Sequence, residues 1–204
     1  MDNTKWNKKY ASSGRLWPAE PSDLLVRFTK SLQPGCALDI AAGEGRNAIW
    51  LAKKGWRVHA VDFSEVAVER GSRASGDMGL AIEWEVRDAT RLEKKQDAYD
   101  LVYIFYLHLP FRELRKVLLR AAESLRINGK LLVVGHDISN IGRGTGGPQD
   151  PQVLYTAGSI QSAVPSLKVE VARTVYREVE HEHSGIQAGK HEKAIDCVYL
   201  GGRV

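Results

Sequence analysis

Residues 37–64, ALDIAAGEGRNAIWLAKKGWRVHAVDFS, constrain the fold more than any other stretch of the chain. They predict a buried strand, a turn at Gly43 and Gly45, a helix, and a second strand that ends in Asp62. A carboxylate at this distance from a glycine loop is typical of a group that bonds the two hydroxyls of an adenosine ribose. The stretch therefore predicts a nucleoside-bearing ligand at the carboxyl ends of parallel strands.

Acidic residues near the two glycines indicate which nucleoside is bound. Asp39 precedes the glycines and Glu44 lies between them. A loop that binds a dinucleotide pyrophosphate should be free of acid, because its amides and helix dipole serve an anion. Two carboxylates instead suit the sulfonium and ammonium groups of S-adenosylmethionine. The third glycine of the dinucleotide fingerprint is also absent, with Ala48 the nearest small residue.

The string LDIAAGEGRNAIWLA, followed by VDFS, resembles the class I S-adenosylmethionine-dependent methyltransferases. Within them it is most similar to the bacterial branch that includes tellurite-resistance and other small-molecule methyltransferases. The resemblance implies a single α/β domain with a doubly wound, mostly parallel seven-stranded sheet, Rossmann-like, ending in an antiparallel hairpin. We expect an N-terminal lid over residues 1–20, a cofactor-binding core over 36–136, a flexible substrate-side loop over 138–155 and the hairpin over 167–204.

The expected cofactor residues lie at the ends of predicted strands. Asp39 is assigned to the cationic end of the cofactor and Asp62 to its ribose. The resemblance places Phe63 against the adenine ring, although a half-buried hydrophobic residue is the simple alternative. It also places Asp88 and Ala89 at the adenine edge, where a helix cap is the alternative role for the acid. The full expected set is Asp39, Ala41, Gly43, Glu44, Gly45, Asn47, Asp62, Phe63, Ser64, Asp88, Ala89, Ile104 and Phe105.

Candidates for the methyl-acceptor side follow two later strands. Tyr106 and His108 come after an apolar run that we expect to pair beside the first strand, where the strand order reverses and ligands bind. His136 and Asp137 end the next predicted strand. A histidine here can serve as a base, or it can be a packed ring or a residue that holds the following loop.

Two further segments are candidate lids. Tyr10 belongs to an aromatic cluster with Trp6 and Trp17, which either packs against the domain or covers the ligand. The loop ISNIGRGTGGPQDPQ is rich in glycine, so we expect it to lack regular structure and to close over the substrate. It is not a phosphate-binding loop, since Pro148 and Gln149 replace the required Lys and Ser or Thr.

The last forty residues change to long β-rich runs, which predict an antiparallel hairpin. Such an ending separates class I methyltransferases from nicotinamide-dependent dehydrogenases. His181 and His183 would share one strand face and could bind a metal with His191 across the turn. Because no further ligand is evident, we expect no metal.

Composition limits the remaining classes. The chain of 204 residues is 43% hydrophobic and contains no long apolar span, so we expect no membrane insertion. Its formal charge of +4 is spread over the chain, and the basic stretch 111–126 predicts an amphipathic helix with a solvated face rather than a nucleic-acid site. The absence of a signal-like N-terminus, and the reading of Cys36 and Cys197 as reduced thiols, predict a cytoplasmic protein.

The sequence thus predicts an enzyme that transfers the sulfonium methyl of S-adenosylmethionine to a nucleophile on a small molecule by in-line displacement. One alternative is a non-catalytic S-adenosylmethionine-binding regulatory module, which would keep the cofactor residues. The other is an NAD-dependent oxidoreductase, which the acids beside Gly43 disfavour. Neither the acceptor nor the oligomeric state follows from the residues.

Overall fold

The computed structural model describes residues 3–12, 14–93, 95–179 and 193–204. Its strands are β1 (Cys36–Ile40), β2 (Arg57–Asp62), β3 (Ile82–Val86), β4 (Tyr99–Phe105), β5 (Leu125–His136), β6 (Lys168–Glu178) and β7 (Lys193–Gly202). Its helices are α1 (Asn3–Ser12), α2 (Asp23–Thr29), α3 (Arg46–Lys53), α4 (Glu65–Asp77), α5 (Phe111–Glu123) and α6 (Ala157–Ala163), with short 3₁₀ helices η1 (Ala89–Arg91) and η2 (Ile138–Asn140).

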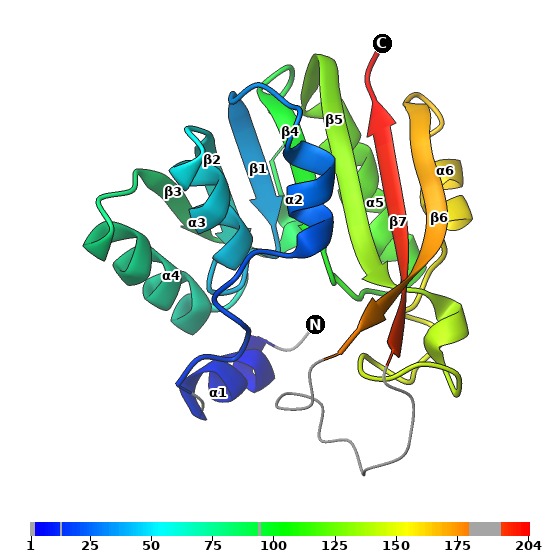
Figure 1. Ribbon diagram of the computed structural model, residues 1–204, viewed down its shortest axis with the longest axis horizontal. Coiled ribbons are helices and arrows are strands. Elements are labelled where there is room, and N and C mark those ends of the chain that lie inside the picture. Colours follow the sequence, from blue (N-terminus) through cyan, green and yellow to red (C-terminus); the bar gives the residue numbers. More distant parts are fainter. Residues whose placement is uncertain (1–2, 13, 94, 180–192) are drawn as a thin grey trace.

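The strands form one seven-stranded sheet in the order β3-β2-β1-β4-β5-β7-β6 (Figure 1). The first five strands in that order are parallel, and β7 runs antiparallel to both β5 and β6. This confirms the predicted doubly wound sheet with its antiparallel C-terminal hairpin. The predicted position of the apolar run of β4 beside β1 is also confirmed.

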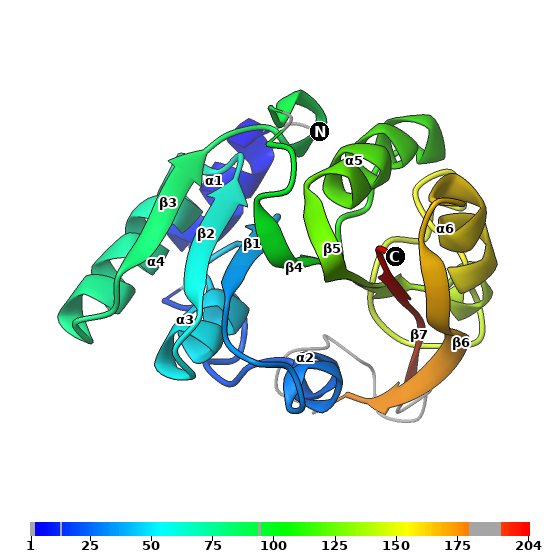
Figure 2. The same ribbon diagram turned by 90° about the horizontal axis from the view of Figure 1, so that it is seen from above.

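Helices cover both faces of the sheet, which explains why the central strands are apolar along their whole length (Figure 2). Successive residues of a strand point to opposite faces. In β1, Leu38 and Ile40 therefore pack in the cluster that contains α5 and α6 side chains. Ala37 packs in the other cluster, with Leu25 of α2 and Leu51 of α3. The site residues are carried by this doubly covered core.

The structure differs from expectation in one helix boundary and in the loop after β5. α5 ends at Glu123, before the basic stretch 111–126 is complete, because Leu125 already pairs with Tyr99 as the first residue of β5. The loop after β5 is not without regular structure, since it begins with η2, which is capped by the Asp137 side chain. No helix of the described residues is long and apolar enough to cross a membrane.

Candidate functional site

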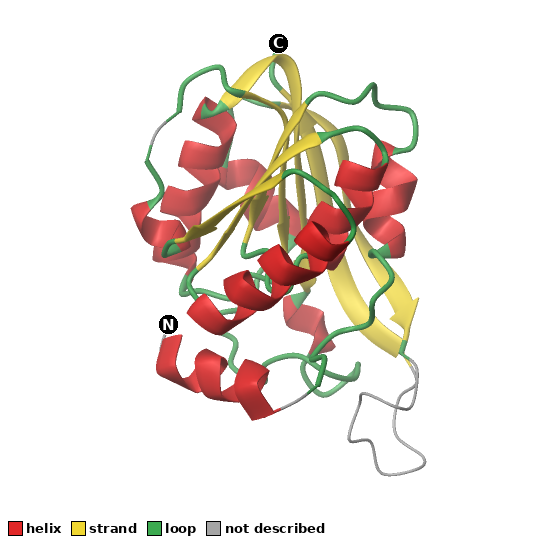
Figure 3. Ribbon diagram, turned by 90° about the vertical axis from the view of Figure 1, so that its left-hand side faces the viewer, coloured by secondary structure: helices red, strands yellow, loops and turns green. Residues whose placement is uncertain are grey.

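The sheet order brings four predicted features to one edge. Parallel strands end at the same edge, so Asp62 at the end of β2, the glycine loop after β1, Tyr106 after β4 and His136 at the end of β5 follow one another across the sheet. α1 lies across this end of the sheet, away from its two helix-covered faces (Figure 3). The arrangement defines a site with a glycine-loop half and a histidine half.

Asp62 is positioned by the backbone of the glycine loop. Its Oδ2 accepts from the Gly43 amide at 2.8 Å, and its Oδ1 accepts from the Ser64 amide at 2.9 Å. Burial raises the pKa of this carboxyl, while the two amides act in the opposite direction. Each carboxylate oxygen keeps a second lone pair, so both can still accept from the hydroxyls of a ribose. The geometry fits the role predicted for Asp62.

Asp39 differs from Asp62, because one of its buried oxygens has no donor and its negative charge would be unpaired. The residue is 1% exposed, and its Oδ2 has no hydrogen-bond partner among the described residues. Burial raises the pKa of this carboxyl to about 8. A cation bound beside it would compensate the buried acid, which is what the sulfonium and ammonium groups of the predicted cofactor supply. The site therefore fits that cofactor at its cationic end.

Asp39 should make folding of the ligand-free protein pH-dependent. Its pKa of about 8 in the folded state lies above the unfolded value near 3.8, so the folded state retains a proton that the unfolded chain loses. The free energy of unfolding should consequently fall as pH rises from about 4 to about 8. We expect Asp39→Asn to flatten this dependence in urea unfolding at pH 5 and pH 8. An unchanged slope would show that Asp39 titrates normally.

Arg46 is a further candidate site residue that was not predicted from the sequence. It opens α3 next to the glycine loop, and burial lowers the pKa of its guanidinium, with charge contributions from Tyr106, Arg177 and Asp39. Among the described residues it makes no ion pair. A half-buried arginine beside Asp39 could hold the carboxylate of an amino-acid group while the acid faces the ammonium. The sequence did contain a signal for this residue. Arg46 is a cation at the start of a predicted helix, where the helix dipole is already positive, and together they favour an anion.

Three predicted cofactor residues make structural contacts within the chain. Glu44 accepts from the Leu16 amide at 3.0 Å and from Arg70 at 3.2 Å, so its carboxylate fastens the N-terminal segment. Asn47 Oδ1 accepts from the Ser22 amide at 2.9 Å. Gly45 faces the Trp84 ring, because a Cβ there would lie 2.2 Å from Cη2 of that ring.

The backbone is strained where β1 and β4 end. Ala41 has φ 65° and Tyr106 has φ 57°, in the left-handed region that residues with a Cβ rarely adopt. Gly43 has φ 57° as well, and a Cβ there would lie 2.8 Å from the Tyr10 hydroxyl. Strain of this kind persists where the surrounding structure imposes it, and it concentrates at functional sites. Its occurrence on adjacent strands marks the point where the sheet order reverses.

The remaining predicted cofactor residues lie on the same edge. Asp88 Oδ1 accepts from the Thr90 amide and hydroxyl, both at 2.8 Å, so the acid caps η1, as the alternative interpretation held. Ala89 is buried at the start of η1, and Phe63 is half-buried directly after β2. Ile104 and Phe105 close β4 and are buried. Ser64 caps α4, as its role at a helix start predicts.

The N-terminal segment closes over the glycine loop. Tyr10 is buried, and its hydroxyl accepts from Trp17 Nε1 at 3.3 Å. Asn7 Oδ1 accepts from the Ser64 hydroxyl at 2.6 Å, which joins α1 to the cap of α4. Burial, together with nearby Asp62, raises the pKa of the Tyr10 phenol, so this residue is suited to covering a ligand and not to acting as a base.

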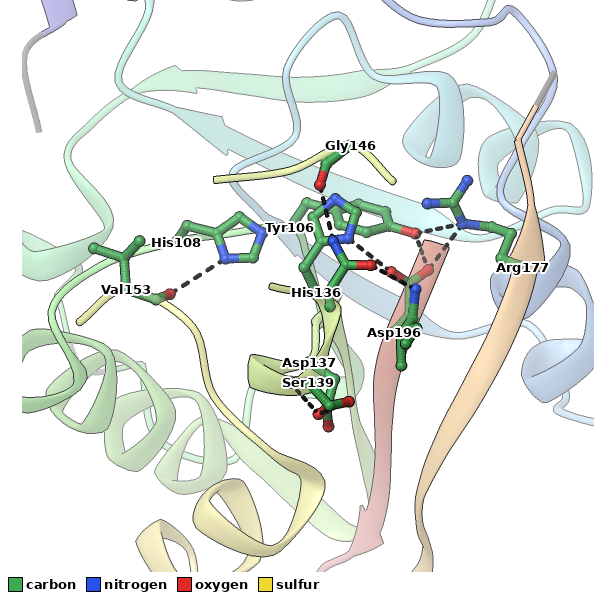
Figure 4. Close-up of polar contacts among 11 residues, drawn as sticks. Tyr106, His108, His136, Asp137, Ser139, Gly146, Val153, Arg177 and Asp196 are labelled. Carbon is green, nitrogen blue, oxygen red and sulfur yellow. Dashed lines mark hydrogen bonds and ion pairs between the residues drawn. The ribbon is translucent and has the colours of Figure 1, made fainter. Parts of the chain in front are cut away.

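The histidine half of the site is an aromatic cluster (Figure 4). The rings of His108 and His136 stack at 5.5 Å with 14° between their planes, and Tyr106 lies 5.1 Å from His136. His108 Nδ1 lies 3.3 Å from the carbonyl oxygen of Val153. The structure thus brings three of the four predicted acceptor-side residues together, whereas Tyr10 lies with the glycine loop.

Asp196 and Arg177 complete this cluster and were not predicted. Asp196 lies opposite His136 in the β5–β7 register, and Arg177 comes from β6. Oδ1 of Asp196 is 3.0 Å from Nδ1 of His136, and Oδ2 accepts from Arg177 Nε at 2.8 Å (Figure 4). The signal in the sequence was a lone acid inside the otherwise apolar run AIDCVYL.

The substrate-side loop is anchored to the sheet. Asn140 donates to the Gly146 carbonyl at 2.8 Å and accepts from the Ile195 amide at 2.8 Å. Gly147 follows with φ 73°, and a Cβ there would lie 2.3 Å from the His136 ring. The loop therefore packs on the histidine half of the site, and glycine at 147 leaves the room that this ring needs.

The three histidines that could have bound a metal in the alternative considered above, His181, His183 and His191, lie outside the described residues. Within the described ranges, no group of three or more His, Cys, Asp or Glu side chains is arranged to hold a metal ion.

The class of protein follows from this fold and site. A doubly wound sheet with an antiparallel hairpin, a glycine loop after β1 and a buried acid at the end of the neighbouring β2 defines a class I adenosyl-cofactor fold. Residues 37–129 match the methyltransferase domain family. No curated protein matches the sequence.

Solved structures share the fold at low identity. One of these structures describes the conversion of a disulfide bond into a thioacetal group during echinomycin biosynthesis. It superposes with TM-score 0.75 and 18% identity, over 98% of this chain and 92% of that chain. TehB from Haemophilus influenzae has TM-score 0.74 and 15% identity, over 100% and 68%. Magnesium protoporphyrin IX methyltransferase from Synechocystis PCC 6803, with bound S-adenosylhomocysteine, has TM-score 0.65 and 15% identity, over 98% and 84%.

The match over residues 37–129 and the class I fold together support an S-adenosylmethionine-dependent methyltransferase. Its cofactor is S-adenosylmethionine, and its reaction requires a methyl acceptor.

The ribose assignment predicts a loss of cofactor affinity when Asp62 is replaced. We expect Asp62→Ala to weaken S-adenosylmethionine binding by about 1–3 kcal/mol, since the ribose hydroxyls would lose their buried acceptor. Titration calorimetry measures this change. Asp77→Ala, at the exposed end of α4, is the matched control and should leave the affinity unaltered. Equal affinities of both variants for S-adenosylmethionine would contradict the ribose assignment of Asp62.

Proposed function

We propose that the enzyme transfers the methyl group to a nucleophile on a small molecule by in-line displacement. The observation that carries this proposal is the cluster of Tyr106, His108 and His136, which lies beside the cofactor edge and beneath the anchored loop. Such a place suits an acceptor that must meet the methyl group in line and away from water. When bound, S-adenosylmethionine supplies an electrophilic methyl on a sulfonium.

Different residues of the chain would bind the different parts of the cofactor. Asp62 would bind the ribose, and Asp88 with Ala89 would lie at the adenine. Asp39 and Arg46 would hold the charged end of the cofactor. The N-terminal segment, fastened by Glu44 and Asn7, would exclude water from the glycine-loop half.

The proposal of a small acceptor is supported by two segments of the chain that cover the site, the N-terminal segment and the loop after β5. Tyr10 lies against Gly43, and Gly147 lies against His136, so both halves of the site are covered by the chain itself. A nucleic acid would need an open, cationic approach, and Arg177 is already paired with Asp196. The free state of Cys36 and Cys197 supports our further proposal of a reducing, cytoplasmic location.

Parallel calorimetric titrations with S-adenosylmethionine, S-adenosylhomocysteine and NAD test the cofactor half of the proposal. We expect both adenosyl compounds to bind and NAD not to bind. Radiolabelled methyl transfer to a panel of thiols, phenols, amines, halides and chalcogen oxyanions then tests the acceptor half. Cofactor binding without methylation of any member would favour a non-catalytic binding module, and binding of NAD alone would favour an oxidoreductase.

A further inference from the structure

Asp196 is a buried acid that is not among the expected cofactor residues. It is fully buried in β7, and the antiparallel register places it directly opposite His136. A carboxylate is retained at such a position only if charged or donating partners hold it. The contacts of Asp196 therefore indicate what it does.

Two donors hold one oxygen of this carboxylate. Arg177 Nε and the Tyr106 hydroxyl both donate to Oδ2, each at 2.8 Å (Figure 4). Burial alone would raise the pKa of Asp196, but His136 and Arg177 bring it below its usual value. Burial and the neighbouring acid raise the pKa of Tyr106, so its phenol stays protonated and continues to donate. Asp196 is consequently an ionised carboxylate with a fixed orientation.

The other carboxylate oxygen of Asp196, Oδ1, determines the tautomer of His136. Oδ1 lies 3.0 Å from Nδ1 of His136, a close contact between two buried atoms that falls outside hydrogen-bond geometry. An ionised carboxylate offers only lone pairs, and a lone pair of Nδ1 facing it at this distance would be repelled, so the contact favours the tautomer with the proton on Nδ1. In the neutral imidazole, Nε2 then has the free lone pair. Asp196 thus leaves His136 with a basic nitrogen at Nε2.

The neighbouring His108 is less suited to be the base. Its Nδ1 donates to the Val153 carbonyl, and its Nε2 is buried without a hydrogen-bond partner among the described residues. Burial, followed by the nearby His136, lowers the pKa of His108 to about 4. A base this weak removes protons poorly near neutral pH. His108 Nε2 can instead accept a hydrogen bond that orients the acceptor.

We propose that Asp196 positions His136 as the general base of methyl transfer, and that the acceptor is a protic nucleophile such as a thiol or a phenol. This inference rests on the proposed function. The acceptor's proton moves to Nε2 of His136, and the freed lone pair forms the bond to the methyl carbon. The carbon–sulfur bond breaks with its electron pair left on sulfur. An acceptor without a proton would gain nothing from this base.

Asp196→Asn tests the positioning role by the tautomer of His136. The asparagine oxygen can still accept from Arg177 and Tyr106, which turns its amide nitrogen toward Nδ1 and moves the histidine proton to Nε2. We expect long-range ¹H–¹⁵N spectra to show Nδ1–H in the wild type and Nε2–H in the variant, with His136→Gln used to assign the signals. Methyl transfer to thiophenol and phenol should fall by about 100-fold or more, with unchanged S-adenosylmethionine affinity.

An Nε2–H tautomer of His136 in the wild-type protein overturns the proposal, and so does an Nδ1–H tautomer retained in the variant. The wild-type spectrum decides even if the variant does not fold. Methylation of selenite but of neither thiophenol nor phenol overturns the acceptor class. A failure of the proposed function is distinguishable, because it would appear as no binding of S-adenosylmethionine, which the tautomer measurement does not require.

Discussion

Replacing His136 with glutamine should reduce methyl transfer by about 10²–10⁴-fold, the range expected when a general base is removed. That loss corresponds to about 3–5 kcal/mol of transition-state stabilisation. The reason is local: the Asp196 carboxylate lies 3.0 Å from Nδ1 of His136 and favours a proton there, which leaves Nε2 to take the proton of the acceptor. Steady-state rates with an acceptor found in the panel measure the effect, and calorimetry should show that cofactor binding is preserved.

His108→Gln is the matched control, because its ring stacks on His136 in the same cluster. Glutamine can keep the donor to the Val153 carbonyl, and the pKa of about 4 already makes His108 a poor base. We expect a loss within about tenfold, as for a single orienting hydrogen bond. Equal losses in both variants would assign the cluster a structural role and contradict the choice of His136.

Gly45→Ala should lower the free energy of unfolding by about 2–5 kcal/mol. Two costs add, since a Cβ at this position would lie 2.2 Å from the Trp84 ring and the residue has φ 76°. Overpacking costs roughly 1–3 kcal/mol, and a left-handed backbone adds about 1–2 kcal/mol for a residue with a Cβ. Urea unfolding measures the change. The Trp84 ring cannot move aside easily, because it also packs on Gly71 and because Nε1 of Trp84 donates to the Ser75 hydroxyl.

Gly76→Ala provides the matched control. Gly76 lies in α4, and a Cβ there would meet no atom within 4 Å. Alanine should therefore stabilise the helix by up to about 1 kcal/mol. If Gly45→Ala proved as stable as Gly76→Ala, the Trp84 ring would have to move freely, and the close packing of α3 on β3 would not explain the glycine.

Sequence reasoning succeeded where neighbours in the chain are neighbours in space. The β1–loop–α3–β2 unit spans fewer than thirty residues, and its strand, glycine and helix patterns predicted the fold at the cofactor edge. It was less successful for individual side chains there. Glu44 and Asn47 follow the expected backbone positions, but their partners are Leu16 and Ser22, which only the folded N-terminal segment brings close.

The sequence by itself determined the sheet, its final hairpin and the class of cofactor, because these follow from local periodicity, glycine conformation and charge beside one loop. The tertiary structure alone decided which residues complete the acceptor half around the predicted Tyr106, His108 and His136. His136 and Asp196 meet only because β7 inserts antiparallel beside β5 in one register, and a one-residue slip would turn Asp196 to the other face. No local pattern encodes that register, since it is set by the packing of both sheet faces. The base and its positioning acid are therefore a property of the folded sheet.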